Sequence, residues 1–269
     1  MNSLMLIGFP LGHSFSQRYF EAKFAALRLD GWRYYNTPIE NIDMLPEAIK
    51  ADDTLRGFNV TIPHKQAVIP FLDRIDDEAA AIGAVNCVKV SRIDGYRGKT
   101  GDGIFLEGFN TDFYGFRHSL TQMIGAHRPD ALVLGTGGAS KAVCHALDSL
   151  GINHLSISRH KSDSTLTYNE LTPQVIKSRL LIINTTPLGM YPATDAAPAI
   201  DYSALTSGHM LFDLVYNPGD TLFLRHGRRA RALVTGGYQM LATQAEHGWE
   251  IFSNQTPHTS LATPLKTRE

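Results

Sequence analysis

The sequence predicts an α/β fold in two parts: an N-terminal α/β substrate domain and a Rossmann-type dinucleotide-binding domain, with a cleft between them. Short apolar, β-rich runs alternate with segments of helical period over most of the chain, which is typical of an α/β fold. The pattern restarts at residue 131, where a glycine-rich turn follows a buried strand. At 269 residues the chain is long enough for two domains of ordinary size.

The first half contains predicted strands and helices in alternation. The strands are expected at Leu4–Gly8, Trp32–Thr37, Phe58–Ile62, Val85–Val90 and Ile104–Gly108. A helix with Phe20, Phe24 and Leu27 on one apolar face follows the first strand. A second helical stretch, around Leu45–Lys50, precedes the third strand. The last two strands form a pair with a long connection, residues 91–103, for which we expect glycine turns at Asp94–Gly95 and Gly101–Gly103.

The second half has the order of a mononucleotide-binding unit extended by further strands. The strands are expected at Ala131–Leu134, His154–Ser158, Leu180–Asn184, Met210–Leu214 and Ala232–Thr235. Between the first two, apolar residues recur at helical spacing, at Ala139, Val143, Leu147 and Leu150. The last helix is predicted at about Gln239–Phe252, and the polar residues 257–269 are expected to form a poorly ordered tail.

The boundary between the two domains is predicted near Asp112. Residues 1–111, completed by a C-terminal helical segment 238–269, would form the first domain, and residues 112–237 the second. The helix Phe113–Ile124 would cross from the first domain to the second, and the final helix would cross back. An active site is then expected in the cleft between the domains.

Composition excludes several other classes of protein. A formal net charge of −1 with interspersed charges argues against a nucleic-acid partner. No apolar run approaches the ~20 residues of a membrane span, and the N-terminus lacks the features of a signal peptide. The two cysteines, Cys87 and Cys144, lie in apolar stretches and are expected to be reduced core residues. We therefore expect a cytoplasmic protein. Because no group of His, Cys and carboxylate residues has the spacing of metal ligands, we expect no metal site.

The glycine-rich turn favours a dinucleotide site. Gly135 permits a tight turn after the strand, Gly137 lets a pyrophosphate approach the backbone, and the amides of the helix start face its phosphates. Ser140 stands where the simple pattern has its third glycine. The alternative is a plain turn from strand to helix.

The end of the next strand favours NADP over NAD. Enzymes that use NAD usually carry an acidic residue ~20 positions after the glycines. Here Arg159 and Lys161 stand at that point, with no acidic residue before Asp163. Cations suit a 2′-phosphate, and arginine can also stack on adenine. The alternative is a solvated strand end.

Polar residues collect at strand ends in the first half. The segment 59–65 is predicted to be one buried strand that delivers Thr61 and Lys65 to one edge, while Asn86 begins a strand and Asp112 follows one. Such a set of donors and acceptors suits a polyhydroxylated ligand. Taken singly, Asn86 could be a turn former, Asp112 a helix N-cap and Thr61 an ordinary strand residue.

Two serines near the N-terminus are candidates for binding a carboxylate. Ser14 and Ser16 lie where a strand leads into a helix, and the N-terminus of a helix attracts anions. A serine at this position can equally cap the helix, and the two roles can coexist.

These motifs together resemble the shikimate dehydrogenase family over nearly the whole chain. Eight segments follow the order of that family: residues 8–16, 59–65, 83–86, 108–112, 135–140, 184–190, 213–218 and 236–244. The resemblance implies that Ser14, Ser16 and Tyr216 bind the substrate carboxylate, and that Thr61, Lys65, Asn86, Asp112 and Gln244 surround the ring hydroxyls, with Lys65 and Asp112 as the catalytic pair. It also implies a set of cofactor contacts: Gly135, Thr136, Gly137, Gly138, Ala139, Ser158, Arg159, His160, Lys161, Leu214, Gly237 and, more weakly, Asp77.

The implied activity is the reversible NADPH-dependent reduction of 3-dehydroshikimate to shikimate, on the route to chorismate and the aromatic amino acids. The implied partner is this small-molecule substrate, and the protein would be a monomer or a homodimer. Alternatives are a quinate/shikimate dehydrogenase that uses NAD and a non-catalytic sensor of the metabolite. The sequence leaves open whether Lys65 is a general base or an electrostatic partner of Asp112.

The chain departs from the family pattern at three places. The first helix usually begins Ser-x-Ser-Pro, but here Gln17 and Arg18 follow the serines. The cofactor strand usually ends Asn-Arg-Thr with a second arginine soon after, but this chain has Asp163 near that position, and Lys161 is the candidate substitute. The connection 91–103 is longer than usual, and its role is open.

Overall fold

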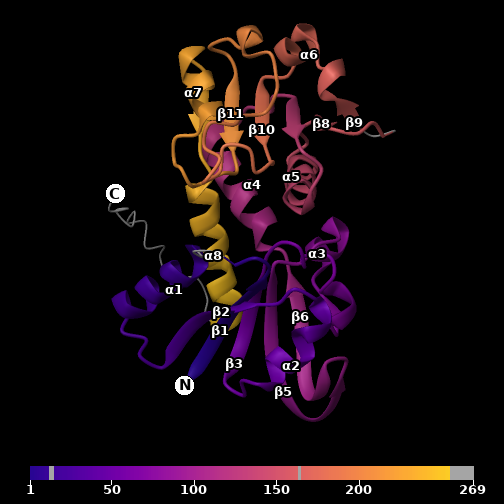
Figure 1. Ribbon diagram of the computed structural model, residues 1–269, viewed down its shortest axis with the longest axis vertical. Helices are drawn as coiled ribbons and strands as arrows, with labels where there is room; N and C mark the ends of the chain where they lie inside the picture. Colours follow the sequence, from indigo (N-terminus) through magenta and orange to yellow (C-terminus); the bar gives the residue numbers. More distant parts are fainter. Residues whose placement is uncertain (12–14, 163–164, 255–269) are drawn as a thin grey trace.

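The structure, a computed structural model, describes residues 1–11, 15–162 and 165–254. Its elements form two lobes stacked along the long axis of the molecule (Figure 1). We call the part built on the first sheet, strands β1–β6, the N-terminal lobe, and the part built on the second sheet, strands β7–β12, the C-terminal lobe. The predicted α/β fold class is confirmed.

The N-terminal lobe contains a mixed six-stranded sheet in the order β2-β1-β3-β5-β6-β4. The strands β1 and β2, β1 and β3, and β4 and β6 pair in parallel, whereas β3 pairs antiparallel with β5, and β5 with β6. The bounds of the strands are β1 Asn2–Gly8, β2 Trp32–Pro38, β3 Leu55–Val60, β4 Arg74–Ile75, β5 Cys87–Gly98 and β6 Gly101–Phe109.

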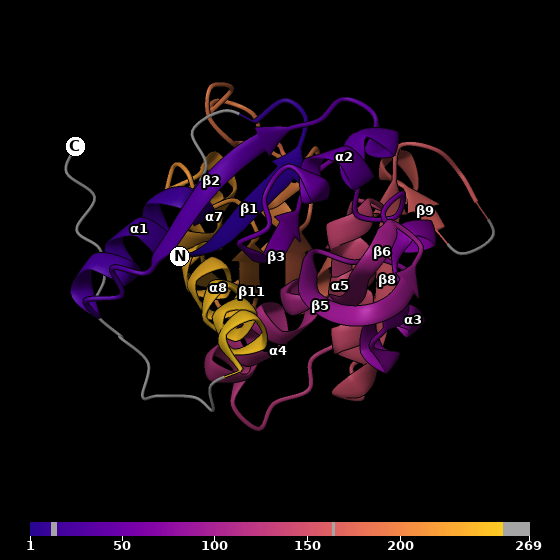
Figure 2. The ribbon, with the colours of Figure 1, turned by 90° about the horizontal axis from the view of Figure 1, so that it is seen from below.

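Helices cover both faces of this sheet (Figure 2). One face packs against α1 (Phe15–Ala26) and α8 (Tyr238–Ser253), whose aromatic side chains, Phe20, Phe24 and Trp249 among them, form one core cluster. The other face packs against α2 (Leu45–Lys50), α3 (Asp77–Ile82) and the 3₁₀ turns η1 (Ile42–Met44) and η2 (Ile69–Phe71). The sheet is therefore buried between two apolar layers.

The third strand ends earlier than predicted. It stops at Val60, and residues 59–65 are not one buried strand, since the side chain of Ile62 is 74% exposed. The amide of Thr61 still donates to the carbonyl of Ile7 at 2.9 Å. Pro63 has no amide hydrogen with which to continue the ladder. Lys65 consequently lies in a turn beyond the sheet edge.

The connection 91–103 also differs from the prediction. Asp94–Gly95 is not a turn, because β5 continues to Gly98 and pairs with β6 through a register shift between Arg92 and Arg97. Gly95 has a φ of 74°, which an irregularity within a strand tolerates when the residue is glycine. The result is one long β-hairpin.

The C-terminal lobe contains a six-stranded sheet in the order β12-β11-β10-β7-β8-β9, with every pair parallel. Read from β7 as the first strand, this is the Rossmann order 3-2-1-4-5-6. The strands are β7 Ala131–Leu134, β8 His154–Ser158, β9 Thr165–Thr167, β10 Leu181–Asn184, β11 Met210–Asp213 and β12 Leu233–Thr235.

Helices also cover both faces of the second sheet. The apolar side chains of α4 (Thr111–Ile124) and α5 (Gly138–Ser149) pack on one face. On the other face lie α6 (Pro173–Ser178), α7 (Leu222–Arg229) and the turn η4 (Tyr202–Ala204), while the turn η3 (Tyr168–Glu170) follows β9. The short elements β4, α3, β9 and α6 are additions to the predicted list.

Two helices join the lobes. Figure 1 shows α4 running from the N-terminal lobe into the C-terminal lobe and α8 returning beside it. A Cβ on Gly115 of α4 would lie 2.5 Å from the carbonyl oxygen of Met240 of α8, so glycine permits this close approach. The predicted domain bounds stay a prediction, and the segment 255–269 lies outside the described residues. None of the described helices is long and apolar enough to cross a membrane.

Candidate active site

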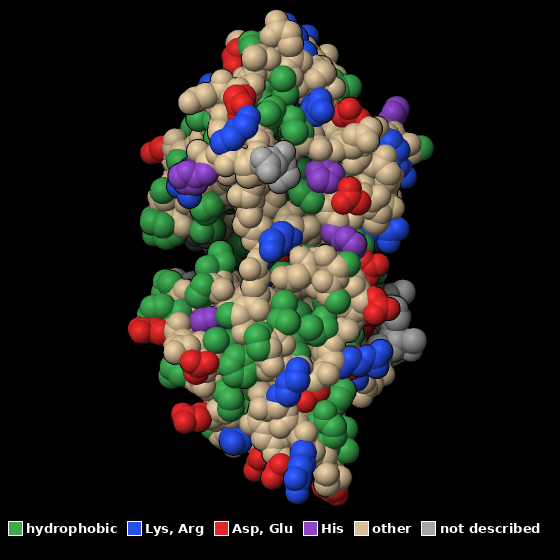
Figure 3. Space-filling view, turned by 90° about the vertical axis from the view of Figure 1, so that its right-hand side faces the viewer, with side chains coloured by type: hydrophobic (Ala, Val, Ile, Leu, Met, Phe, Trp, Pro, Cys, Tyr) green, Lys and Arg blue, Asp and Glu red, His purple; other side chains and the backbone are tan. Residues whose placement is uncertain are grey.

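A cavity of about 900 Å³ opens between the two lobes. The space-filling view shows a waist at this level (Figure 3). The N-terminal lobe contributes the loop after β3, and the C-terminal lobe contributes the carboxyl ends of β7, β8 and β10. The lining residues are Thr61, Ile62, Pro63, Lys65, Gln66, Gly135, Thr136, Gly137, Gly138, Ala139, Ile157, Ser158, Arg159, His160, Tyr168, Thr185, Thr186, Pro187, Leu188, Ala197 and Ala199.

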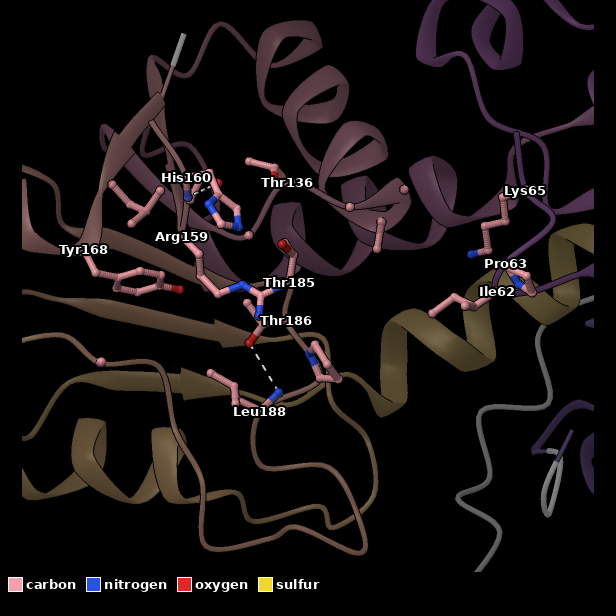
Figure 4. Close-up of a pocket in the computed structure, with 18 of the residues that line it drawn as sticks. Ile62, Pro63, Lys65, Thr136, Arg159, His160, Tyr168, Thr185, Thr186 and Leu188 are labelled. Atoms are coloured by element: carbon pink, nitrogen blue, oxygen red, sulfur yellow. Dashed lines mark hydrogen bonds between the residues drawn. The ribbon is translucent and has the colours of Figure 1, made fainter. Parts of the chain in front are cut away.

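The cavity has two chemically different ends. Figure 4 shows Lys65 with Ile62 and Pro63 at one end, and Arg159, His160 and Tyr168 at the other. Thr136 and Thr185, which follow β7 and β10, lie between these two ends. This position outside the carboxyl ends of β7 and β10 is the switch point of the sheet, where ligands bind in folds of this kind.

Lys65 and Asp112 form an ion pair at the first end. The Nζ of Lys65 donates to Oδ2 of Asp112 at 2.6 Å, and the two side chains are 19% and 14% exposed. Asp112 lies in the first turn of α4, but it is not the N-cap, because Asn110 accepts the hydrogen bond from the amide of Phe113. The carbonyl of Lys65 accepts from the amide of Val85 at 2.8 Å, which fixes the turn. The ammonium group is thus held beside a carboxylate and exposed to the cavity.

Behind this pair lies a buried network of Asn86, Thr111 and Gln244. The Oδ1 of Asn86 accepts from the amide of Thr111 at 2.7 Å, and the hydroxyl of Thr111 lies 2.9 Å from Oε1 of Gln244. The Nδ2 of Asn86 lies 3.1 Å from Oγ1 of Thr111. The structure therefore brings Asn86 and Gln244 together with the neighbour of Asp112. Sequence reasoning missed Thr111, although the quoted segment 108–112 contains it.

The glycine loop after β7 fits a bound pyrophosphate. Gly135 has a φ of 113°, and a Cβ there would lie 2.7 Å from Oγ1 of Thr185. Gly137, in contrast, has no atom within 4 Å of its Cβ position, so its bare face points into open space. The loop leads directly into α5 at Gly138, whose first amides have no partner within the helix. Open glycine backbone beside free amides is what a dinucleotide phosphate requires.

Arg159 and its neighbours form the other end of the cavity. The guanidinium of Arg159 makes no hydrogen bond or ion pair with any residue in the described ranges, which leaves it available to a ligand. Tyr168 lines the same end, and burial raises the pKa of its hydroxyl although the charge of Arg159 opposes that shift. Lys161 does not line the cavity, and its Nζ instead pairs with Oε1 of Glu170.

The predicted carboxylate-binding residues are only partly placed. Ser14 lies outside the described residues. Ser16 lies in the first turn of α1, near the hydroxyl of Tyr34. Tyr216 follows β11, and its ring meets Phe15 edge to face with centroids 5.6 Å apart. Neither Ser16 nor Tyr216 lines the cavity, but the Phe15–Tyr216 contact joins α1 to the C-terminal lobe.

Three predicted cofactor contacts lie away from the cavity lining. Leu214 and Gly237 lie together, since a Cβ on Gly237 would be 2.1 Å from the carbonyl oxygen of Leu214. Asp77 begins α3 and is exposed. The roles assigned to these three residues stay predictions.

Other lining residues had no role in the sequence prediction. Thr185 and Thr186 follow β10, where Oγ1 of Thr185 donates to the carbonyl of Leu134 at 2.8 Å and that of Thr186 to Asn184 at 2.6 Å. Both residues belong to segment 184–190, one of the eight segments that resemble the family. Its position directly after a predicted strand could have indicated a place in the site. Gln66, Tyr168, Ala197 and Ala199 had no such signal, because only the tertiary fold brings them to the cavity.

Comparison with known proteins gives consistent matches over almost the whole chain. Residues 6–88 match the family described as the shikimate dehydrogenase substrate binding domain. The chain is similar to a protein of Clostridium beijerinckii named shikimate dehydrogenase (NADP(+)), with 38% identity over 92% of this chain and 90% of the relative.

Solved structures agree with that match. The crystal structure of shikimate 5-dehydrogenase from Thermus thermophilus in complex with NADP(H) and shikimate has a TM-score of 0.80 and 28% identity, covering 96% of this chain and 95% of that one. Quinate dehydrogenase from Corynebacterium glutamicum in complex with NAD has a TM-score of 0.81 and 26% identity, with the same two coverages.

Proposed function

The chain belongs to the shikimate dehydrogenase family, and from that premise we propose that it interconverts shikimate and 3-dehydroshikimate with NADP as the redox partner. One observation carries the proposal most directly. Lys65 of the N-terminal lobe, paired with Asp112, faces the same cavity as the glycine loop of the C-terminal lobe. The reacting hydroxyl and the cofactor must meet in just such a place.

In this proposal the C-terminal lobe binds the cofactor, and the N-terminal lobe binds the substrate and transfers the proton. NADP, when bound, supplies the hydride acceptor for the oxidation of shikimate. Residues 135–139 would hold its pyrophosphate, and Arg159 its 2′-phosphate. In the N-terminal lobe Lys65, after its ammonium has lost a proton to solvent, would take the proton that leaves the substrate hydroxyl as the carbon–oxygen bond becomes a carbonyl.

Asp112 would position Lys65 and stabilise its protonated form after the proton is taken. Asn86 and Gln244 would exchange some of their mutual hydrogen bonds for bonds to the ring hydroxyls, since amides offer both donors and acceptors. Ser14, Ser16 and Tyr216 would bind the carboxylate. We expect the protein to be a monomer or a homodimer.

A steady-state comparison of shikimate and quinate, each with NADP and with NAD, tests the proposal. We expect kcat/KM to be highest for shikimate with NADP. Higher values for quinate with NAD would instead identify a quinate dehydrogenase like the structural neighbour from Corynebacterium. No turnover with any of the four pairs, while shikimate still binds, would identify a sensor and overturn the proposal.

A further inference from the structure

Glu170 places a negative charge near the arginine end of the cavity. The sequence alone does not predict this position. Its Oε1 accepts from Nζ of Lys161, and its Oε2 accepts from the amide and hydroxyl of Thr167 at 2.8 and 2.9 Å. The bond from the Thr167 amide is one half of a capping box on the turn η3, in which the side chain of Thr167 also accepts from the backbone amide of Glu170. The bonds from Lys161 and Thr167 lower the pKa of Glu170 to about 2, the bond from Lys161 contributing most. The carboxylate is therefore ionised and fixed in place.

The Lys161–Glu170 pair lies at the rim of the cavity. Lys161 directly follows His160, which lines the cavity, and Glu170 ends the turn that begins with the lining residue Tyr168. Neither member of the pair lines the cavity itself. Among the described residues, Arg159 is therefore the one arginine or lysine that lines this end of the cavity.

We propose that Glu170 is a specificity-determining residue for the cofactor: it holds Lys161 away from the 2′-phosphate site and adds a negative charge beside it. The inference rests on the proposed function. It follows that the preference for NADP over NAD is weaker than Arg159 and Lys161 together would give. It also follows that removal of the Glu170 charge releases Lys161 to the phosphate.

The exposure of the pair makes this release feasible. The side chains of Lys161 and Glu170 are 60% and 38% exposed, so packing does not prevent the lysine side chain from turning once the carboxylate charge is removed. A 2′-phosphate carries close to two negative charges, and a carboxylate at the rim of its site repels it without full screening when the separation is within a Debye length of about 8–10 Å. Once freed, the flexible lysine side chain can turn toward the phosphate.

Calorimetric titration with two nucleotide fragments tests the inference without turnover. The probes are 2′,5′-ADP, which carries the 2′-phosphate, and 5′-AMP, which lacks it. The proteins are the full chain and the variants Glu170→Gln, Lys161→Gln and the double variant. Glutamine is chosen because its side-chain oxygen can still accept from Thr167 and keep the capping box.

We expect Glu170→Gln to lower the Kd for 2′,5′-ADP by about threefold to tenfold and to change that for 5′-AMP by less than about twofold. Lys161→Gln alone should change either Kd by less than about twofold, because Glu170 already holds the lysine. In the double variant more than half of the gain should disappear. Such non-additivity would show that the gain in Glu170→Gln depends on the released Lys161 side chain.

Asp220→Asn is the matched control. Asp220 forms an equally exposed ion pair with Arg228 in the same lobe, and it does not line the cavity. The same change of net charge there should leave both Kd values unaltered. An unchanged Kd for 2′,5′-ADP in Glu170→Gln, or an equal gain for 5′-AMP, would overturn the inference. If neither fragment binds the unmodified protein, the proposed cofactor site itself is wrong.

Discussion

At the scale of single residues, the ion pair of Lys65 and Asp112 fixes the position of the lysine beside the cavity. Their charged groups lie 2.6 Å apart and are largely removed from solvent. Removing one member of such a pair leaves the other charge without its partner, which costs more than the pair contributes when intact. The motifs predicted both residues, and the structure adds the buried amide network of Asn86 and Gln244 behind them.

A different carboxylate, Asp52, stabilises the base of the N-terminal lobe. It accepts hydrogen bonds from the hydroxyls of Tyr35 at 2.8 Å and Thr54 at 2.6 Å, and it also pairs with Arg33. Burial alone would raise its pKa, but the hydrogen bonds from Ser3, Thr54 and Tyr35 outweigh burial and hold the pKa well below its usual range. The folded state therefore favours the ionised form.

The pH dependence of stability follows from that shift. Because the folded pKa lies below the unfolded value of ~3.9, the contribution of Asp52 is present above about pH 4 and is lost as the pH falls below it. We expect Asp52→Asn to lower the free energy of unfolding by about 2 kcal/mol at pH 7 and by a smaller amount near pH 3, where the contribution of the ionised carboxylate is partly lost. Urea unfolding at both pH values measures this difference.

The neighbouring Asp53 provides the control for this experiment. Its side chain is 91% exposed, so Asp53→Asn should change the stability by less than about 0.5 kcal/mol at either pH. A loss for Asp52→Asn that is equal at pH 3 and pH 7 would show that the ionised carboxylate is not what stabilises this region.

At the scale of elements, the glycine loop between β7 and α5 combines two separate requirements. Gly135 is needed by the protein itself, because its φ is positive and Thr185 leaves no room for a Cβ. Gly137 has open space beside it and an ordinary φ of −79°. The fold itself therefore does not require glycine at this position.

Alanine substitutions should separate these two requirements. We expect Gly135→Ala to lower the free energy of unfolding by about 1–3 kcal/mol, because alanine is strained at a positive φ. Gly137→Ala should stay within ~1 kcal/mol of the parent but weaken binding of NADP by about tenfold or more, through a clash with the pyrophosphate. Chemical denaturation and calorimetry measure the two effects. Equal losses of stability would contradict this division.

The success of the sequence prediction also varied by element. The bounds of β7 and β8 agree with the prediction. β7 is a buried apolar run, whereas β8 alternates apolar Leu155 and Ile157 with polar residues, and both patterns indicate strands. Among the missed elements, α3 and α6 span six residues each, β9 three and β4 two, which is too short for a periodic pattern to emerge. The hairpin was misread because glycine signals both turns and strand irregularities.

At the scale of the whole molecule, the site depends on how the two lobes meet. Besides α4 and α8, His145 of α5 reaches Glu78 of α3 across the boundary at 2.5 Å. The sequence predicted a cleft and a polar set on each side of it, because strand ends gather at the edge of a sheet. It could not predict that Tyr168 lines the arginine end of the cavity and that Glu170 lies at its rim, since the short 3₁₀ turn η3 after β9 places them there.

The central claim is that Lys65 handles the proton in a reaction whose redox partner binds the opposite lobe. Steady-state kinetics of Lys65→Ala with shikimate and NADP tests this claim most directly. We predict a kcat at least ~100-fold below that of the unmodified protein, with a much smaller change in KM, because proton transfer contributes to the transition state more than to binding. The melting temperature should confirm that the variant is folded. A folded variant that keeps a kcat within about threefold of the unmodified enzyme would contradict the account.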